Sequence, residues 1–250
     1  MIIQIYEIQD PREAEKCIEL GVDHIGSVIL SLEAWKQPQI KETIGIAHSA
    51  GKKSSLICLF QDLHTISSAI EYYQPDFIHF CESVVDNFGR PIDLDPFLRL
   101  QESIKHRFPE IQIMRSIPIA PPGRNPSPPS LAIAKEFIPV TDIFLTDTWL
   151  GREPVKGYIG ITGRPLDWNV AAQLVKQTRL PVILAGGLSP DNVYEAVVKV
   201  RPAGADSCTG TNMADEKGRP IRFKKDFVKV RRFVSEIRRA EQELARMNRQ

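Results

Sequence analysis

Residues 181–210 read PVILAGGLSPDNVYEAVVKVRPAGADSCTG. An apolar run ends in two glycines, a helical pattern with Ser189 as its expected N-cap runs from Pro190 to Val200, and a second short run starts at Gly204. Such runs are too apolar to face water on one side, which is typical of parallel strands covered on both faces. The stretch therefore predicts a strand–helix–strand unit of an α/β protein.

The same alternation fills the chain from end to end. The expected strands are residues 1–8, 24–30, 54–60, 76–81, 111–117, 142–147, 181–186 and 204–210. The expected helices are residues 11–20, 38–50, 63–73, 95–108, 131–137, 168–178, 190–200 and 224–250. A doubly wound open sheet and a closed (β/α)8 barrel both fit, and the count of eight favours the barrel. We expect one TIM-barrel domain over residues 1–250, with a parallel eight-stranded core and a long basic C-terminal helix.

Composition excludes several classes of protein. The 250 residues are 42% apolar and 25% charged, which is typical of a globular domain and not of a disordered or disulfide-framework chain. No apolar run reaches the roughly 18 residues of a membrane span, and the first residues do not form an export signal. We therefore expect a cytoplasmic protein. Its four cysteines form no CxxC pair, so free thiols are expected and a zinc site is not.

The charge is unevenly distributed. Residues 217–250 hold twelve basic and four acidic residues, a net charge of +8, and the total of +1 leaves −7 for the rest. A basic end can bind nucleic acid, but apolar residues at helical spacing favour a docked helix with a solvated basic face. These apolar residues are Phe223, Phe227, Val230, Val234, Ile237 and Leu244. No nucleic-acid or membrane partner is expected, and a homodimer is left open.

Residues 118–130, PIAPPGRNPSPPS, break the rhythm with six prolines. Proline fixes φ and removes a backbone donor, so the segment is expected to be a stiff loop. It follows the fifth expected strand, which places it at the catalytic end of a barrel. A rigid rim of the active site and an inert extended connection both fit.

Small residues at the ends of the last strands predict an anion site. Gly186 and Gly187 let the backbone approach a ligand, and the N–H groups at the start of the next helix favour a negative charge. Thr209 and Gly210 end the eighth strand, and in barrels the last two such loops commonly bind one phosphate. Gly163 and Arg164, in the loop after strand six, can add an amide donor and a positive charge. These residues predict phosphate binding, with ordinary tight turns as the alternative.

The second half resembles the phosphoribosylanthranilate isomerase family. The stretches that carry the resemblance are Leu145-Thr146-Asp147-Thr148, Gly160-Ile161-Thr162-Gly163 with Asp167-Trp168, Leu184-Ala185-Gly186-Gly187-Leu188, and Asp206 to Gly210, within about residues 142–234. The resemblance implies a (β/α)8 barrel that performs an Amadori rearrangement of a phosphoribosyl substrate, in tryptophan biosynthesis, without a metal or organic cofactor. It also implies that Asp147 is the general acid.

The first half departs from the family. In the family a cysteine at the end of strand one is the general base, and here Tyr6 takes that inward position. An unperturbed tyrosine has a pKa near 10, so it would be a poor base at neutral pH. His79, in the rewritten end of strand four, and Arg115, near the end of strand five, are candidates for substrate binding. Two alternatives stay open: an enzyme acting on a different phosphorylated sugar or metabolite, and a non-catalytic homologue that binds a phosphometabolite.

Overall fold

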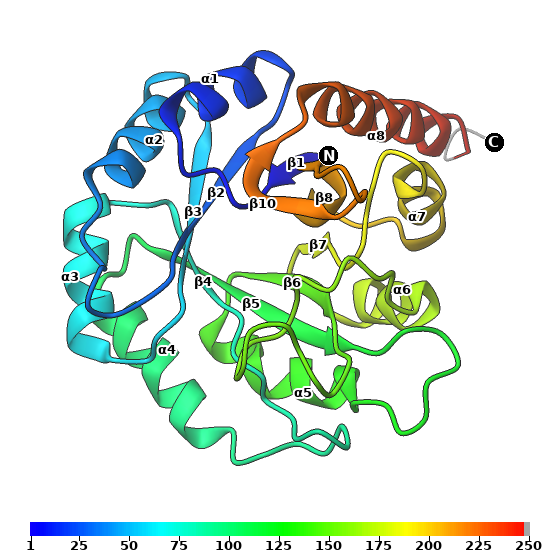
Figure 1. The fold of residues 1–250 in the computed structure, drawn as a ribbon. Helices are drawn as coiled ribbons and strands as arrows, with labels where there is room; N and C mark the ends of the chain where they lie inside the picture. Colours follow the sequence, from blue (N-terminus) through cyan, green and yellow to red (C-terminus); the bar gives the residue numbers. More distant parts are fainter. Residues whose placement is uncertain (248–250) are drawn as a thin grey trace.

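A computed structural model describes residues 1–247 as a closed barrel ringed by helices (Figure 1). The barrel strands are β1 (Ile2–Ile5), β2 (His24–Ile29), β3 (Lys53–Cys58), β4 (Phe77–Phe80), β5 (Gln112–Ile119), β6 (Ile143–Thr148), β7 (Val182–Leu184) and β8 (Gly204–Ser207). The helices are α1 (Pro11–Glu19), α2 (Pro38–Ser49), α3 (Leu63–Tyr73), α4 (Asp95–Arg107), α5 (Ser130–Phe137), α6 (Trp168–Gln177), α7 (Val193–Val200) and α8 (Phe227–Met247).

All neighbouring strands of the barrel are parallel, and β1 closes it by pairing with both β2 and β8. In this register Gln4 lies opposite His24 on one side and Asp206 on the other. The predicted (β/α)8 barrel is confirmed. No helix within residues 1–247 is long and apolar enough to cross a membrane.

Side-chain caps explain several helix starts. Asp10 accepts a hydrogen bond from the Arg12 amide at 2.8 Å, and Pro11 occupies the first turn of α1 as expected. The expected start of α7 at Pro190 is wrong, because Asn192 holds the chain in a turn. Its side chain accepts from the Ser189 amide at 2.9 Å and donates to the Gly187 carbonyl at 3.0 Å, so α7 begins at Val193.

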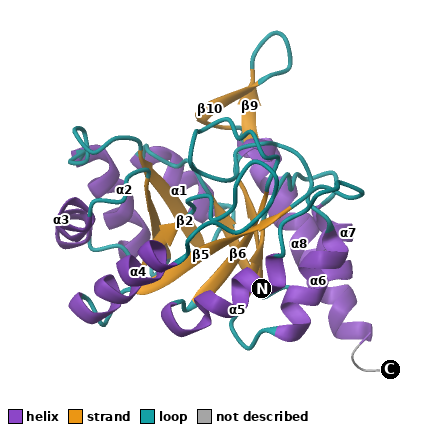
Figure 2. Ribbon diagram, turned by 90° about the horizontal axis from the view of Figure 1, so that it is seen from below, coloured by secondary structure: helices purple, strands orange, loops and turns teal. Residues whose placement is uncertain are grey.

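A hairpin that was not expected lies between β8 and α8. Strands β9 (Asn212–Ala214) and β10 (Pro220–Lys225) are antiparallel, and they project from the end of the barrel where β8 stops (Figure 2). Asp215 holds the connecting turn by accepting from the amides of Lys217 at 2.9 Å and Arg219 at 2.8 Å. The predicted helix start at residue 224 is therefore wrong, and Phe223 belongs to β10. Asp226 caps α8 instead, and residues 248–250 of the predicted helix lie outside the described residues.

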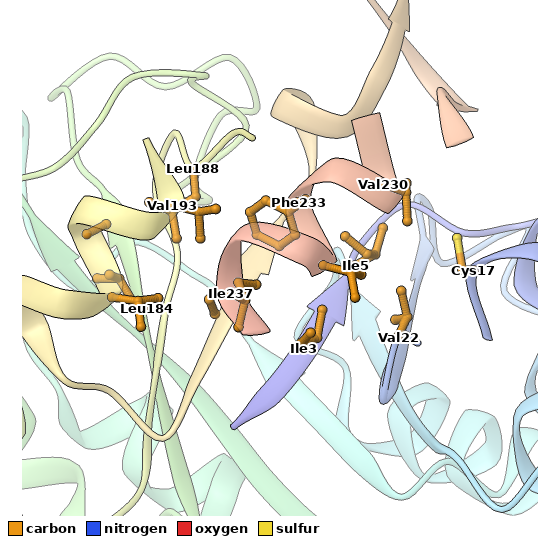
Figure 3. Packing of buried hydrophobic residues seen from close by; sticks show 14 of the residues in the cluster. Ile3, Ile5, Cys17, Val22, Leu184, Leu188, Val193, Val230, Phe233 and Ile237 are labelled. Atoms are coloured by element: carbon orange, nitrogen blue, oxygen red, sulfur yellow. The ribbon is translucent and has the colours of Figure 1, made fainter. Parts of the chain in front are cut away.

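The basic helix α8 is docked on the barrel, as its apolar spacing predicts. Val230, Phe233 and Ile237 are fully buried in one cluster with Ile3 and Ile5 of β1 (Figure 3). Burying a side chain of this size contributes roughly 1.5–3 kcal/mol. Helix α8 therefore covers the outer face of the first strand.

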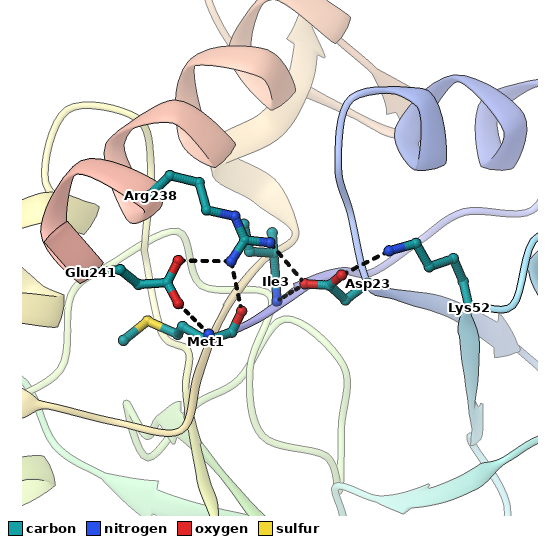
Figure 4. Close-up of polar contacts among 6 residues, drawn as sticks. All are labelled: Met1, Ile3, Asp23, Lys52, Arg238 and Glu241. Carbon is teal, nitrogen blue, oxygen red and sulfur yellow. Dashed lines mark hydrogen bonds and ion pairs between the residues drawn. The ribbon is translucent and has the colours of Figure 1, made fainter. Parts of the chain in front are cut away.

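Ionic contacts fix α8 beside Met1, at the start of β1 (Figure 4). Arg238 donates to the Met1 carbonyl at 3.0 Å and to Glu241 at 2.8 Å, and its guanidinium lies 3.2 Å from Asp23. Asp23 also accepts from Lys52 at 2.9 Å and from the Ile3 amide at 3.1 Å. Burial alone would raise the pKa of Asp23, but these hydrogen bonds lower it below its usual value.

The proline-rich segment 118–130 packs against the loop after β6. Arg124 donates to the Leu150 carbonyl, and its guanidinium lies 4.9 Å from the Trp149 ring. Ser130 donates to the Pro118 carbonyl at 2.6 Å. The segment thus lies at the catalytic end of the barrel, where it contacts Trp149 and Leu150 of the loop after β6.

Candidate active site

The ends of β7 and β8 and the loop after β6 enclose one pocket. Its lining includes all five residues predicted to bind phosphate: Gly163, Gly186, Gly187, Thr209 and Gly210. Within residues 1–247, the amides of Gly163, Gly186 and Gly187 donate to no protein acceptor. Amides left without partners around a cavity are suited to an anion. This arrangement supports the predicted phosphate site.

Gly187 shows why a glycine is required where these loops meet. Its φ is +62°, and an added Cβ would lie 2.2 Å from the Arg164 carbonyl carbon. Any side chain would therefore separate the two loops that share the pocket. The side chain of Arg164 is exposed and is not among the pocket-lining residues, so only its backbone helps to shape the site.

Asp147 lies at the carboxyl end of β6, where barrel chemistry takes place. Burial raises the pKa of Asp147 to about 7, although the Thr148 amide, donating at 2.8 Å, opposes this rise. The side chain borders the phosphate pocket and a second pocket beside it. A carboxyl group with a pKa near neutrality can donate a proton at the pH of a cell.

The second pocket is mostly apolar and continues from the phosphate pocket. Both pockets share Asp147, Ile161, Asp206 and Cys208. The apolar part of the lining consists of Val28, Ile57, Leu59, Leu145, Tyr158, Ile159 and Ile161. The site thus has one end lined by amides without a protein acceptor, an apolar end, and carboxyl groups between them.

Tyr6 points into the barrel as the alternation of β1 predicts, but its hydroxyl is already engaged. It hydrogen-bonds Ser55 and, at 2.7 Å, Nδ1 of His79, whose Nε2 lies 2.8 Å from the Ser116 hydroxyl. Burial raises the pKa of Tyr6 well above 10. These features argue against Tyr6 as the base. Burial also lowers the pKa of His79 to about 3, so this pocket-lining ring is neutral.

Arg115, predicted as a substrate contact, lies outside the pocket. It points outward from β5, because the flanking Met114 and Ser116 face the barrel interior. Its guanidinium donates to the Glu82 carboxylate at 2.7 Å and lies 4.7 Å from the Phe137 ring, with no exposed surface. The prediction for Arg115 is wrong, and the residue forms a buried ion pair between the barrel and its helices.

Asp206 and Glu7 are site residues that the predictions missed. Burial, opposed by the hydrogen bond from Gln4 and helped by the nearby charge of Asp147, raises the pKa of Asp206 to about 8. Glu7 follows β1 and pairs with Arg222 of the hairpin at 2.6 Å. The sequence did contain a feature that could have indicated Asp206 as a site residue, because Asp206 is the only charged residue within β8.

The chain matches the family model described as N-(5'phosphoribosyl)anthranilate (PRA) isomerase over residues 112–235. It is 36% identical over 135 residues to N-(5'-phosphoribosyl)anthranilate isomerase of Methanocella arvoryzae, a match that spans 54% of each chain, or about half of the relative's length. The enzyme of that name from Methanothrix thermoacetophila is 28% identical over 249 residues, covering 94% of this chain and 97% of the relative.

Solved structures show the same fold. The N-(5'-phosphoribosyl)anthranilate isomerase of Pyrococcus furiosus superposes with a TM-score of 0.65 at 20% identity, covering 96% of this chain and 99% of that one. At that identity the likeness is one of fold alone. Together with the sequence matches, this likeness shows that the chain belongs to the N-(5'-phosphoribosyl)anthranilate isomerase family.

Proposed function

We propose that this protein isomerises N-(5'-phosphoribosyl)anthranilate without a cofactor. The observation that carries the proposal is the position of Asp147, between a pocket lined by unpartnered amides and an apolar pocket. The amides would hold the phosphate, and the apolar pocket would hold the aromatic ring. Asp147 would then lie beside the ribose that joins them.

The reaction needs one acid and one base. Asp147 donates its proton to the ring oxygen of the ribose, the C1–O bond breaks, and the nitrogen lone pair forms an iminium with C1. Removal of the C2 proton then leaves an enaminol, which becomes the ketose when C1 gains a proton and the C2 hydroxyl loses one. The raised pKa of Asp147, caused by burial, keeps part of this carboxyl protonated at neutral pH.

The test is the loss of substrate fluorescence on isomerisation, with wild type, Asp147→Asn and Asp95→Asn. Losing a general acid is expected to lower kcat by about 10²–10⁴-fold. Asp95→Asn removes an exposed carboxylate on α4 and should behave as wild type. A wild-type protein that does not accelerate the reaction, or an Asp147→Asn variant as active as wild type, refutes the proposal.

One observation favours a second candidate, an enzyme for a phosphoribosyl amine with an uncharged aglycone. Anthranilate carries a carboxylate, but no lysine or arginine is among the described residues that line the apolar pocket, whereas Glu7, Asp147 and Asp206 are. A carboxylate there would face like charges. A substrate that lacks the carboxylate distinguishes the two candidates: it should be the poorer substrate for the first and the better one for the second.

A further inference from the structure

The proposed reaction needs a base that removes the C2 proton, and the residue in the family's cysteine position does not meet that need. The Tyr6 hydroxyl is bonded to Ser55 and His79 within the barrel. His79 has both of its ring nitrogens engaged. A base for this chain must therefore come from another strand that borders the pocket.

Five other titratable side chains border the apolar pocket near Asp147: Glu7, Cys81, Tyr158, Asp206 and Cys208. Burial raises the pKa of the Tyr158 hydroxyl above its usual value, which makes this group a poor base. Glu7 is held by Arg222 at 2.6 Å and by Asn212 at 3.4 Å, so its charge is already paired. Burial raises the pKa of both thiols well above 9, which leaves little thiolate near neutral pH. Asp206 is the carboxyl group that remains.

The placement of Asp206 suits proton transfer. Its strand, β8, is the direct neighbour of β1, so Asp206 lies one strand away from the position that the family's base occupies. It borders both pockets, as Asp147 does. Strands β6 and β8 are separated only by β7, so the two carboxyl groups reach the same cavity from different strands.

A buried side chain on β1 orients Asp206. Gln4 donates from Nε2 to Oδ1 of Asp206 at 3.2 Å, and its Oε1 lies 3.3 Å from Nδ1 of His24. Gln4 is fully buried, so this contact fixes one carboxylate oxygen. Within residues 1–247, the other oxygen accepts no hydrogen bond and is not enclosed by protein atoms. That oxygen is available to a substrate, and Gln4 is a positioning residue for it.

We propose that Asp206 is the general base of this enzyme, replacing the strand-one cysteine of its family. The inference rests on the proposed function. After Asp147 has opened the ribose ring, Asp206 takes the proton from C2, and the electrons of the C2–H bond form the C1=C2 bond of the enaminol. The iminium nitrogen then regains its lone pair. Asp206 ends protonated and Asp147 ionised, and proton exchange with water restores both groups.

The test compares wild type, Asp206→Asn, Asp206→Ala and the exposed control Asp95→Asn, each with ordinary substrate and with substrate deuterated at C2. Asp206→Asn is expected to lower kcat by about 10²–10⁴-fold, while Asp95→Asn keeps the wild-type rate. Asp206→Ala should regain activity with added formate, a small carboxylate that can replace the lost base. Rescue of this kind is not expected from a residue that serves only the fold.

Binding of a reduced, non-isomerisable product analogue, followed by thermal shift, shows whether each variant is folded. If the wild-type protein is inactive, the proposed function itself is refuted. Two outcomes with an active wild type overturn the assignment of Asp206 but leave the proposed function standing. One is an Asp206→Asn variant whose kcat is within tenfold of the wild-type value. The other is a folded Asp206→Ala variant that formate does not rescue. If neither variant folds, wild type still decides. A base at Asp206 requires the kcat/KM of wild type to fall as the pH drops below about 7, the lower of the pKa values of Asp147 and Asp206. It also requires a primary isotope effect with the substrate deuterated at C2. Absence of both overturns the assignment.

Discussion

Gly160 lies directly against the carboxylate of Asp147, and replacing it by alanine offers a sharp test of the acid's position. Its φ is +101°, and an added Cβ would lie 2.2 Å from Oδ2 of Asp147. Ordinary contact begins at 3.4 Å, so one of the two groups must move by the difference, about 1.2 Å. A misplacement of about 1 Å at a reacting group can cost about 10²-fold in rate, which is about 2.7 kcal/mol.

Gly157 provides the matched control. It has a similar φ of +86°, but its added Cβ would meet nothing within 4 Å. Both alanine variants should lose about 1–2 kcal/mol of stability, because an L-residue is strained at positive φ. Only Gly160→Ala should lose about 10²-fold in kcat.

Steady-state kinetics with the fluorescence assay and urea unfolding measure the two effects separately. Equal kcat values for the two variants at saturating substrate would show that the position of the Asp147 carboxylate does not govern the rate. That result would refute the expected effect of Gly160→Ala on the acid. A rise in KM alone would also contradict it, since the clash is with the acid and not with the phosphate pocket.

Three further predictions concern stability and pH. Phe233→Ala, which empties a fully buried site between α8 and the barrel, should lower the free energy of unfolding by about 3–5 kcal/mol in urea titrations; a loss below 1 kcal/mol would contradict the packing. The lowered pKa of Asp23 means that its stabilising contribution is present above the unfolded value of 3.8 and is lost as pH falls through the lower folded value. Asp23→Asn should therefore weaken the acid dependence of unfolding, and an unchanged dependence would count against the contacts in Figure 4. With the pKa of Asp147 near 7 and that of Asp206 near 8, kcat/KM should peak between these values and fall on both sides, so a flat profile from pH 6 to 9 would exclude the pair.

The barrel was predictable from sequence because each unit carries its own local signals. Asp10 followed by Pro11 starts a helix, and Gly186 followed by Gly187 ends a strand, without reference to distant residues. That the residues predicted to bind phosphate would line one pocket could be predicted for the same reason. In a (β/α)8 barrel, local strand ends converge at one mouth whatever the rest of the sequence is.

The errors have a common physical origin. Both faces of β5 are buried, so its sequence does not show which residues point inward, and Arg115 is a wrong candidate for substrate binding because it points outward. The hairpin was missed because its turn depends on hydrogen bonds that the Asp215 carboxylate accepts from backbone amides. The apolar residues that flank the turn also fit a helical spacing. The raised pKa of Asp206 arises from burial and from Asp147, which lies far away in sequence, so only the fold could indicate it.

The parallel pairing of β1 with β8, the first and last strands of the barrel, determines when the barrel can close during synthesis. One barrel neighbour of β1, β8, and the helix α8 that packs with Ile3 and Ile5 both come from the last fifth of the chain. During synthesis from the N-terminus, one hydrogen-bonding edge of β1 must wait unpaired until that segment emerges, and so must the contacts that α8 makes in the cluster of Ile3 and Ile5. Contacts so distant in sequence slow folding, which makes an interrupted chain of this protein prone to aggregate through its first strand.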